Sequence, residues 1–316
     1  MNNAEILVGD AVSRLQQLPN EAVRTCVTSP PYWGLRDYGS DGQLGLEGTP
    51  SEFVENLCQV FDEVWRVLSD DGTLWVNLGD SYAGNSQSRA SNNGRAGYGN
   101  PREGTVPRLG DGLKHKDLVG IPWRFAFAMQ DRGWYLRQDI IWAKPNPMPE
   151  SVRDRCTKSH EYIFLFSKQP KYFFDHEAIQ EPAIHSEDRR AGKGRLEYDG
   201  KRQGEKGTGQ EAFVSIKEFK NKRSVWNVSV ASYKEAHFAV YPTALIEPCI
   251  KAGSAEGDTV LDPFSGSGTT GEVALKLGRN YIGCELNPDY ARLSEKRITE
   301  ALGMFAEVTV NERVTG

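Results

Sequence analysis

The stretch TVLDPFSGSGTT, residues 259–270, indicates the fold class of this chain. Residues 259–261 are β-branched or aliphatic, as in a buried strand, and the glycines at 266 and 268 favour a turn whose backbone approaches a ligand closely. Residues 269–277 continue as a helix. A strand that enters a helix through a Gly-rich turn is typical of α/β sheets that hold a nucleotide-like ligand at the strand's carboxyl end.

Strands and helices alternate on both sides of this stretch. Further strands are expected at residues 5–8, 23–28, 73–78, 134–142, 161–166, 225–229 and 280–286. Further helices are expected from residue 50 and at residues 11–18, 121–131, 241–252 and 290–302. The helix from residue 50 has the clearest start, because Thr49 and Glu52 form a capping box and Pro50 fits its first turn. The alternation predicts an α/β fold with a Rossmann-like, doubly wound sheet.

Two stretches interrupt the alternation and carry a local excess of positive charge. Residues 84–116 hold six Lys or Arg against two acids, and residues 185–224 hold eleven against seven, in a chain of net charge -5. A cation-rich face on an acidic body is expected when one side contacts phosphate, and the alternative is that both stretches are solvated loops. The expected organisation is a half-domain at 1–170 with a mobile basic loop at 84–116, an inserted region at 175–224, and a second half-domain at 225–316.

The composition argues against several other classes of protein. No apolar stretch approaches the length of a membrane span, and residues 1–9 lack the pattern of a signal peptide. The five cysteines are scattered without a Cys-x-x-Cys pair, which argues against a zinc site or a disulfide framework. We therefore expect a chain that works in the reducing cytoplasm, without a metal or a membrane partner.

A second motif, Ser29-Pro30-Pro31-Tyr32, follows the expected strand at 23–28. The Ser29 hydroxyl and the Pro30 carbonyl are acceptors, neither proline has an N–H group, and Tyr32 has an aromatic face. Two acceptors without a competing donor suit the exocyclic amine of a flat base that has been drawn out of a duplex. The alternative for this motif alone is an ordinary proline turn beside a buried tyrosine.

Together the two motifs resemble those of the amino-methyltransferases of DNA, which move a methyl group from S-adenosyl-L-methionine to an exocyclic base nitrogen. Because the catalytic motif precedes the cofactor motif, the order resembles the permuted beta class of that family. The similar segments are residues 5–38, 71–82, 134–168 and 237–290. The resemblance implies a methyltransferase sheet with an inserted target-recognition region, and most of the two basic stretches match no segment of the family.

The resemblance also implies roles for named residues. The expected catalytic residues are Ser29, Pro30, Pro31 and Tyr32. The residues expected to contact the cofactor are Asp10, His237, Asp262, Pro263, Phe264, Ser265, Gly266, Ser267, Gly268, Thr269 and Glu285. Glu285 ends a strand about 20 residues after the Gly-rich turn, where an acid can accept hydrogen bonds from ribose hydroxyls. The alternative role of Asp262 is a helix cap, and that of His237 is purely structural.

Cytosine N4 is the expected acceptor of the methyl group. In the resembling family, Ser before Pro-Pro-Tyr is more common in cytosine-N4 enzymes, whereas Asp or Asn is more common in adenine-N6 enzymes. Adenine N6 is the alternative within the class. The dipeptide Pro248-Cys249 occurs in cytosine carbon-5 enzymes, but it lies in an expected helix here and does not indicate that chemistry.

Three other functions compete with this interpretation. A P-loop would need Lys after Gly268, where two threonines follow, so nucleotide hydrolysis is disfavoured. A nicotinamide-dependent dehydrogenase would use the glycines and Glu285 for a dinucleotide, and a DNA-binding protein would bind duplex without methyl transfer. The implied partner is duplex DNA. Some members of the family pair with a cognate restriction endonuclease or form homodimers, and both partners stay open for this chain.

Overall fold

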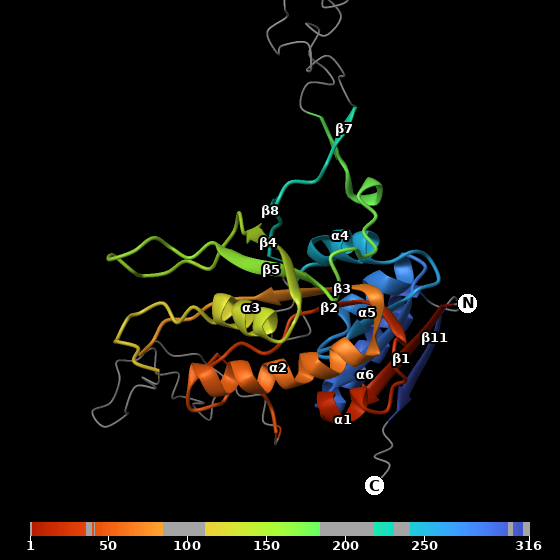
Figure 1. Cartoon of the computed structure of the whole chain (residues 1–316), viewed down its shortest axis with the longest axis horizontal. Helices are drawn as coiled ribbons and strands as arrows, with labels where there is room; N and C mark the ends of the chain where they lie inside the picture. The colour runs from red at the N-terminus through yellow and green to blue at the C-terminus, as the bar shows by residue number, and fades with distance from the viewer. Residues whose placement is uncertain are drawn as a thin grey trace, which may run out of the picture.

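The computed structural model describes residues 2–35, 40, 42–84, 111–183, 218–230, 241–302 and 306–311. Within these residues nine strands form one central sheet with helices on both faces (Figure 1). The order across the sheet is β11 (Ala306–Asn311), β1 (Asn2–Val8), β10 (Asn280–Glu285), β9 (Thr259–Asp262), β2 (Val23–Thr28), β3 (Leu68–Leu78), β5 (His160–Ser167), β4 (Tyr135–Ala143) and β8 (Val225–Asn227). The predicted α/β doubly wound sheet is confirmed.

Two apolar clusters join the helices to the two faces of the sheet. One contains residues of α1 (Ala11–Leu15), α2 (Pro50–Val67) and α3 (Ile121–Asp131), and the other contains residues of α4 (Thr243–Gly253), α5 (Thr269–Lys276) and α6 (Pro288–Leu302). Successive side chains of β2 alternate between them, since Cys26 lies in the first cluster and Val27 in the second. The sheet is therefore buried on both faces, which explains why its central strands are nearly continuous apolar runs.

The chain reverses its direction of winding between β9 and β2. These strands pair in parallel, with Thr25 opposite Val260 and Cys26 opposite Leu261. From β9 the chain passes through α5 to β10 on one side, whereas from β2 it passes through α2 to β3 on the other. In open α/β sheets a ligand binds in the crevice at such a switch point, outside the carboxyl ends of the strands. The two motifs of the sequence follow these two strands.

Strand β5 is the reversed strand of the sheet. It runs antiparallel to β3 and to β4, with Leu78 opposite Tyr162 and Trp142 opposite Glu161. Because it is reversed, its first residues lie beside the last residues of its two neighbours. Polar residues from three strands thus meet at the same edge of the sheet as the two motifs.

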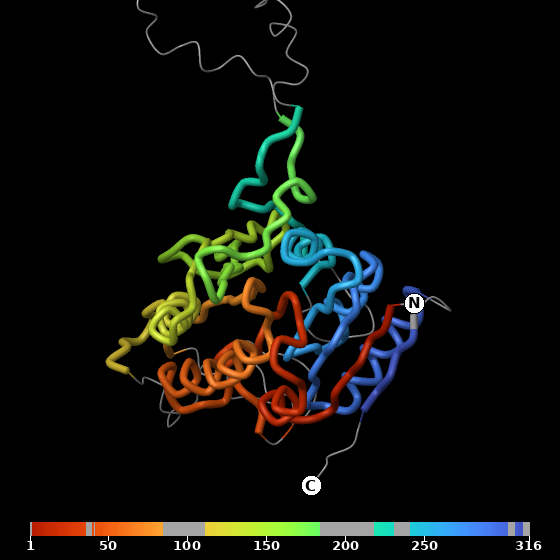
Figure 2. Tube along the Cα trace, turned by 45° about the vertical axis from the view of Figure 1, so that its right-hand side comes forward, coloured from red at the N-terminus to blue at the C-terminus, as the bar shows by residue number. Residues whose placement is uncertain are grey.

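Helix α2 starts as predicted, because Thr49 Oγ1 accepts from the Glu52 N–H at 3.2 Å and a Glu52 carboxylate oxygen accepts from the Thr49 N–H at 3.1 Å. Other boundaries differ from the prediction. Strand β3 begins at Leu68, directly after α2, and α1 ends at Leu15. Strand β11 was not predicted; it pairs with β1, and the two lie side by side at one edge of the sheet (Figure 2).

The described parts of the expected insertion contain little regular structure. The regular elements there are a single 3-10 turn, η1 (Glu177–Ile179), and a two-stranded ribbon of β6 (Glu181–Pro182) and β7 (Phe219–Lys220). The ribbon projects from the sheet beyond β8 (Figure 1). The rest of the insertion and most of the expected basic loop lie outside the described residues. No helix in the described part of the chain is long and apolar enough to cross a membrane.

Candidate active site

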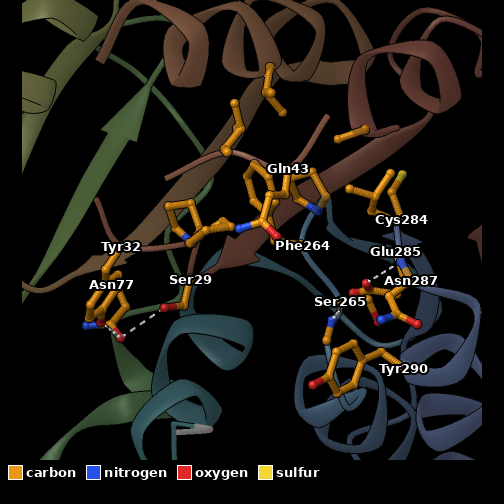
Figure 3. Close-up of a pocket in the computed structure, with 18 of the residues that line it drawn as sticks. Ser29, Tyr32, Gln43, Asn77, Phe264, Ser265, Cys284, Glu285, Asn287 and Tyr290 are labelled. Carbon is orange, nitrogen blue, oxygen red and sulfur yellow. Dashed lines mark hydrogen bonds between the residues drawn. The ribbon is translucent and has the colours of Figure 1, made fainter. Parts of the chain in front are cut away.

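A cavity of about 540 Å³ opens at the carboxyl ends of β9 and β2. Its wall includes residues from both sequence motifs, among them Ser29, Tyr32, Phe264 and Ser265 (Figure 3). The expected site residues that line it are Asp10, Ser29, Pro30, Pro31, Tyr32, Pro263, Phe264, Ser265, Gly266, Ser267, Thr269 and Glu285. The fold therefore brings together in one cavity two motifs that are more than 200 residues apart in the sequence.

The cavity has two chemically different ends. In Figure 3, Ser29, Tyr32 and Asn77 lie together at one end, and Ser265, Glu285 and Tyr290 lie at the other. The ring of Phe264 and the side chain of Gln43 lie between these ends (Figure 3). A molecule in the cavity can therefore contact both groups of residues at once.

Asp262 is buried beneath the cavity and is not part of its wall. Its carboxylate accepts hydrogen bonds from Thr28 Oγ1 at 2.6 Å, Thr270 Oγ1 at 2.6 Å, Phe264 N at 3.0 Å and the Tyr241 hydroxyl at 3.2 Å. Burial raises the pKa of Asp262, and these hydrogen bonds oppose that rise. In this structure Asp262 holds the end of β2, the turn and α5 together from behind the cavity wall, and its direct contact with a cofactor stays a prediction.

The two glycines of the turn have different roles. Gly266 has a φ of 53°, and its N–H donates to Glu285 Oε2 at 2.8 Å on the cavity wall. Gly268 has a φ of 78° and lies outside the cavity wall, and a Cβ there would come within 2.3 Å of Ser294 Oγ. Gly268 is therefore required where the turn packs against α6, because a side chain there would clash with Ser294.

Glu285 is a half-buried acid of the cavity wall. Its two carboxylate oxygens accept from the N–H groups of Gly266 and Asn287, each at 2.8 Å. Burial raises the pKa of Glu285 to about 7, and the backbone hydrogen bonds lower it in part. A carboxylate held by two backbone donors at the end of β10 is oriented as an acceptor for hydroxyl groups.

Asp10 lies at the end of β1 and caps α1. Its Oδ1 accepts from the backbone N–H and from the hydroxyl of Ser13, both at 2.9 Å. The capping role and a place on the cavity wall are compatible, because only one carboxylate oxygen is used by these two bonds. His237 lies outside the described residues.

Ser29 and Tyr32 share a neighbour that the sequence did not single out. Ser29 Oγ lies 3.4 Å and the Tyr32 hydroxyl 3.3 Å from Asn77 Oδ1. The Tyr32 ring packs closely against the backbone of Gly79, where an added Cβ would lie 2.5 Å from a ring carbon. Tyr32 is thus a fixed part of the cavity wall, held by its ring and by its hydroxyl.

Other residues of the wall could not be found from local sequence motifs, because the order and direction of the strands bring them to the cavity. Asn77 is near the end of β3, Lys144 follows β4, and Glu161 is near the start of the reversed strand β5. Trp142 also contributes to this wall. A prediction that placed the reversed strand between its neighbours would have found them. Cys249, in contrast, is buried in α4 away from the cavity wall, as the sequence indicated.

Comparison with known proteins agrees with this geometry. The sequence profile of the N6/N4 DNA methylase family matches residues 23–296. This chain belongs to that DNA methylase family. The DNA methylase is 48% identical over 301 residues to the type II methyltransferase M.Cfr9I of Citrobacter freundii, and the match covers 94% of this chain and 88% of the relative.

Two solved structures resemble this DNA methylase. A protein of Thermus thermophilus, crystallised with S-adenosyl-L-methionine, is 26% identical with a TM-score of 0.61, and the match covers 98% of this chain and 100% of that one. The cytosine-N4-specific PvuII DNA methyltransferase is 20% identical with a TM-score of 0.62, and the match covers 95% of this chain and 91% of that one. The second comparison supports the fold alone.

Proposed function

We propose that this DNA methylase transfers a methyl group from S-adenosyl-L-methionine to cytosine N4 in duplex DNA, after the base has been drawn into the cavity. The observation that carries the proposal is the single cavity that holds Ser29 at one end and Glu285 at the other. The order of the two motifs supports membership of the permuted beta class, and the similarity to M.Cfr9I supports a type II enzyme.

The cofactor end of the cavity has groups that match each part of S-adenosyl-L-methionine. Glu285 is an oriented acceptor for the ribose hydroxyls, and the hydroxyls of Ser265, Ser267 and Thr269 can bond the charged amino-acid tail. The aromatic side chain of Tyr290 lies on the same wall and can contact the adenine ring. When bound, S-adenosyl-L-methionine supplies an electrophilic methyl carbon on its sulfonium sulfur.

The other end of the cavity prepares the acceptor amine. Its lone pair is delocalised into the base, so the amine is a poor nucleophile until its N–H groups are held by acceptors. Ser29 Oγ is one such acceptor and the Pro30 carbonyl is the second. The aromatic ring of Tyr32 is a surface on which the base can stack. The protein contributes orientation and hydrogen bonds here, not a nucleophile.

The proton of the methylated amine leaves to water in this account. Ser29 Oγ is weakly basic, and its neighbour Asn77 carries an amide, which takes no proton near neutral pH. The described contacts therefore contain no chain of acids and bases that would carry a proton from Ser29 into the protein.

Cytosine is proposed over adenine because position 29 is Ser and not Asp or Asn. Both bases present two N–H donors, so adenine N6 is the alternative product. We further propose that the inserted region at 175–224 recognises the target sequence and that 84–116 contacts phosphates. By similarity to the family, we also propose that the protein is cytoplasmic, that it has a cognate restriction endonuclease and that it forms a homodimer.

The proposal is tested by incubating the protein, duplex DNA and S-adenosyl-L-methionine with a deuterated methyl group. We expect label in the DNA and a loss of roughly 100-fold or more in the rate for Ser29→Ala, because one acceptor at the reacting nitrogen is removed. DNA binding without label would favour a DNA-binding protein. Binding of a nicotinamide dinucleotide in place of S-adenosyl-L-methionine would favour a dehydrogenase.

A further inference from the structure

A half-buried carboxylate, Glu161, accepts from three donors in the cavity wall beside Ser29. Its Oε2 accepts from the Tyr32 hydroxyl at 2.7 Å and from Asn77 Nδ2 at 3.3 Å, and its Oε1 contacts the Lys144 ammonium. The side chains of Glu161 and Lys144 are 13% and 17% exposed. These contacts connect four segments of the wall at the edge of the sheet.

Glu161 decides which end of the Asn77 amide faces Ser29. The two N–H groups of Asn77 Nδ2 donate to Glu161 Oε2 at 3.3 Å and to the Tyr162 carbonyl at 3.0 Å. In the flipped orientation the amide oxygen would face these two acceptors, and the NH₂ group would face the hydroxyls of Ser29 and Tyr32. Because a carboxylate and a carbonyl only accept, they fix the amide with Oδ1 toward Ser29.

The Tyr32 hydroxyl leaves this amide oxygen available. It is closer to Glu161 Oε2, at 2.7 Å, than to Asn77 Oδ1, at 3.3 Å, so its single hydrogen is directed to the carboxylate. Asn77 Oδ1 then accepts from Ser29 Oγ. Lys144 occupies the other oxygen of the carboxylate and also lies 4.2 Å above the centre of the Trp142 ring.

We infer that Glu161 is a positioning residue that sets the hydrogen-bond polarity of Ser29 through Asn77. A Ser29 hydroxyl that donates to Asn77 presents only acceptor lone pairs to the cavity. A hydroxyl that donated into the cavity would bond the lone pair of the base amine and weaken it as a nucleophile. The inference rests on the proposed function, since it concerns how Ser29 meets an amine.

The first test is Glu161→Gln. The new amide oxygen will turn to the Lys144 ammonium, so its NH₂ group will face the donors of Tyr32 and Asn77. The Asn77 amide is then free to flip and Ser29 to turn its hydrogen into the cavity. We expect kcat to fall roughly 10- to 100-fold, while the Kd values for S-adenosyl-L-methionine and for duplex DNA stay within about twofold.

The decisive variant is Glu161→Gln combined with Lys144→Met. Without the ammonium, the Gln amide can offer its oxygen to Asn77 and Tyr32 again, so the acceptor on that side of the wall is restored. We expect kcat of the double variant to recover about fivefold or more over that of Glu161→Gln. An ion pair that merely stabilised the fold would give a double variant no more active than the single one. Lys144→Met alone completes the double-mutant cycle, so that the recovery is measured as the coupling between positions 161 and 144.

A Glu161→Gln protein with wild-type kcat, or a double variant without recovery, overturns the inference. A wild-type chain that transfers no methyl group overturns the proposed function and the inference with it, so the two failures are distinguishable. If Glu161→Gln does not fold, Asn77→Leu replaces it, since removal of the acceptor for Ser29 should also lower kcat with S-adenosyl-L-methionine binding unchanged. Full activity of Asn77→Leu contradicts the inference.

Discussion

At the scale of single residues, Asp262 shows how a motif residue can act from behind the site. Its carboxylate holds Thr28, Thr270 and Tyr241 from three different segments. Asp262→Ala removes the buried acceptor that these three hydroxyls share, so we expect the free energy of unfolding to fall by about 2–4 kcal/mol. We also expect loss of S-adenosyl-L-methionine binding, because the turn at 263–267 is displaced. Denaturant titration measures the change in stability, and calorimetry measures the change in cofactor affinity. Binding of duplex DNA should remain. An unchanged cofactor affinity would contradict this role of Asp262.

The raised pKa of Glu285 leads us to predict that cofactor binding depends on pH. Its pKa of about 7 lies above the ordinary value of 4.5, so the folded protein holds this proton more tightly than the unfolded chain. Ionising Glu285 therefore costs about 3 kcal/mol of stability as the pH rises from 4.5 to 7, but only the ionised form accepts from both ribose hydroxyls. We expect the affinity for S-adenosyl-L-methionine to rise about tenfold from pH 6 to pH 8.

The matched control for this pH dependence is Glu285→Gln, which has no titrating group. Its cofactor affinity should be lower than that of the wild type at pH 8 and constant between pH 6 and pH 8. Calorimetry at both values separates the two proteins. A Glu285→Gln variant with the wild-type pH dependence would assign the titration to another group.

Tyr32 combines a stacking face with a hydroxyl that is tied to Glu161. Tyr32→Ala should weaken the capture of an extruded base by about 1–3 kcal/mol, the usual contribution of a base stacked on an aromatic ring. Tyr32→Phe keeps the ring and should retain most of the capture. Fluorescence of 2-aminopurine at the target position reports the extruded base, and equal signals from the wild type and Tyr32→Ala would leave Tyr32 with a packing role only.

At the scale of secondary-structure elements, the sequence predicted what is encoded locally. The apolar period and the capping box of α2 are local signals, and both are present in the structure. The start of β3 at Leu68 was missed because Asp70, Asp71 and Gly72 disfavour a strand locally. In the structure they lie at a register shift between the pairs Val23–Leu68 and Thr25–Thr73 that join β3 to β2. Strand β11 alternates Val308 and Val310 with polar residues, a pattern that indicates a half-buried strand.

The capping box allows a test at this scale. Thr49→Ala removes the acceptor for the Glu52 N–H at the start of α2, so we expect the free energy of unfolding to fall by about 1 kcal/mol. Thr49→Ser keeps the hydroxyl and should be close to the wild type. Thermal or denaturant unfolding of the three proteins measures the difference, and equal stability of Thr49→Ala would show that the cap contributes nothing.

At the scale of the whole molecule, the site depends on which strands become neighbours. The sequence identified Ser29 and the turn at 263–267, since each is a compact motif. It did not identify Asn77, Lys144 or Glu161, because these become neighbours of Ser29 only through the reversed strand β5. The buried position of Asp262 was equally invisible, since a motif specifies a turn and not which side chains of that turn face the cavity.

The charge distribution of the whole chain leads to a prediction about salt. If residues 84–116 and 185–224 contact phosphates, the logarithm of the DNA affinity should fall linearly with the logarithm of the salt concentration. Neutralising Lys114 and Lys116 should flatten that slope by up to about 2, whereas neutralising Lys251 on α4 is the control and should not. A slope that is the same in both variants would make residues 84–116 a solvated loop, and residues 185–224 need their own charge-neutralised variants.

The central claim is the transfer of a methyl group to cytosine N4, and the identity of the product tests it most directly. Duplex DNA treated with the protein and S-adenosyl-L-methionine is digested to nucleosides, which are separated and weighed by mass spectrometry against standards. We predict N4-methyl-deoxycytidine, which the wild type forms and Ser29→Ala forms far more slowly. N6-methyl-deoxyadenosine as the sole product would contradict the assignment of the base, and unmodified DNA would contradict the account of the active site as a whole.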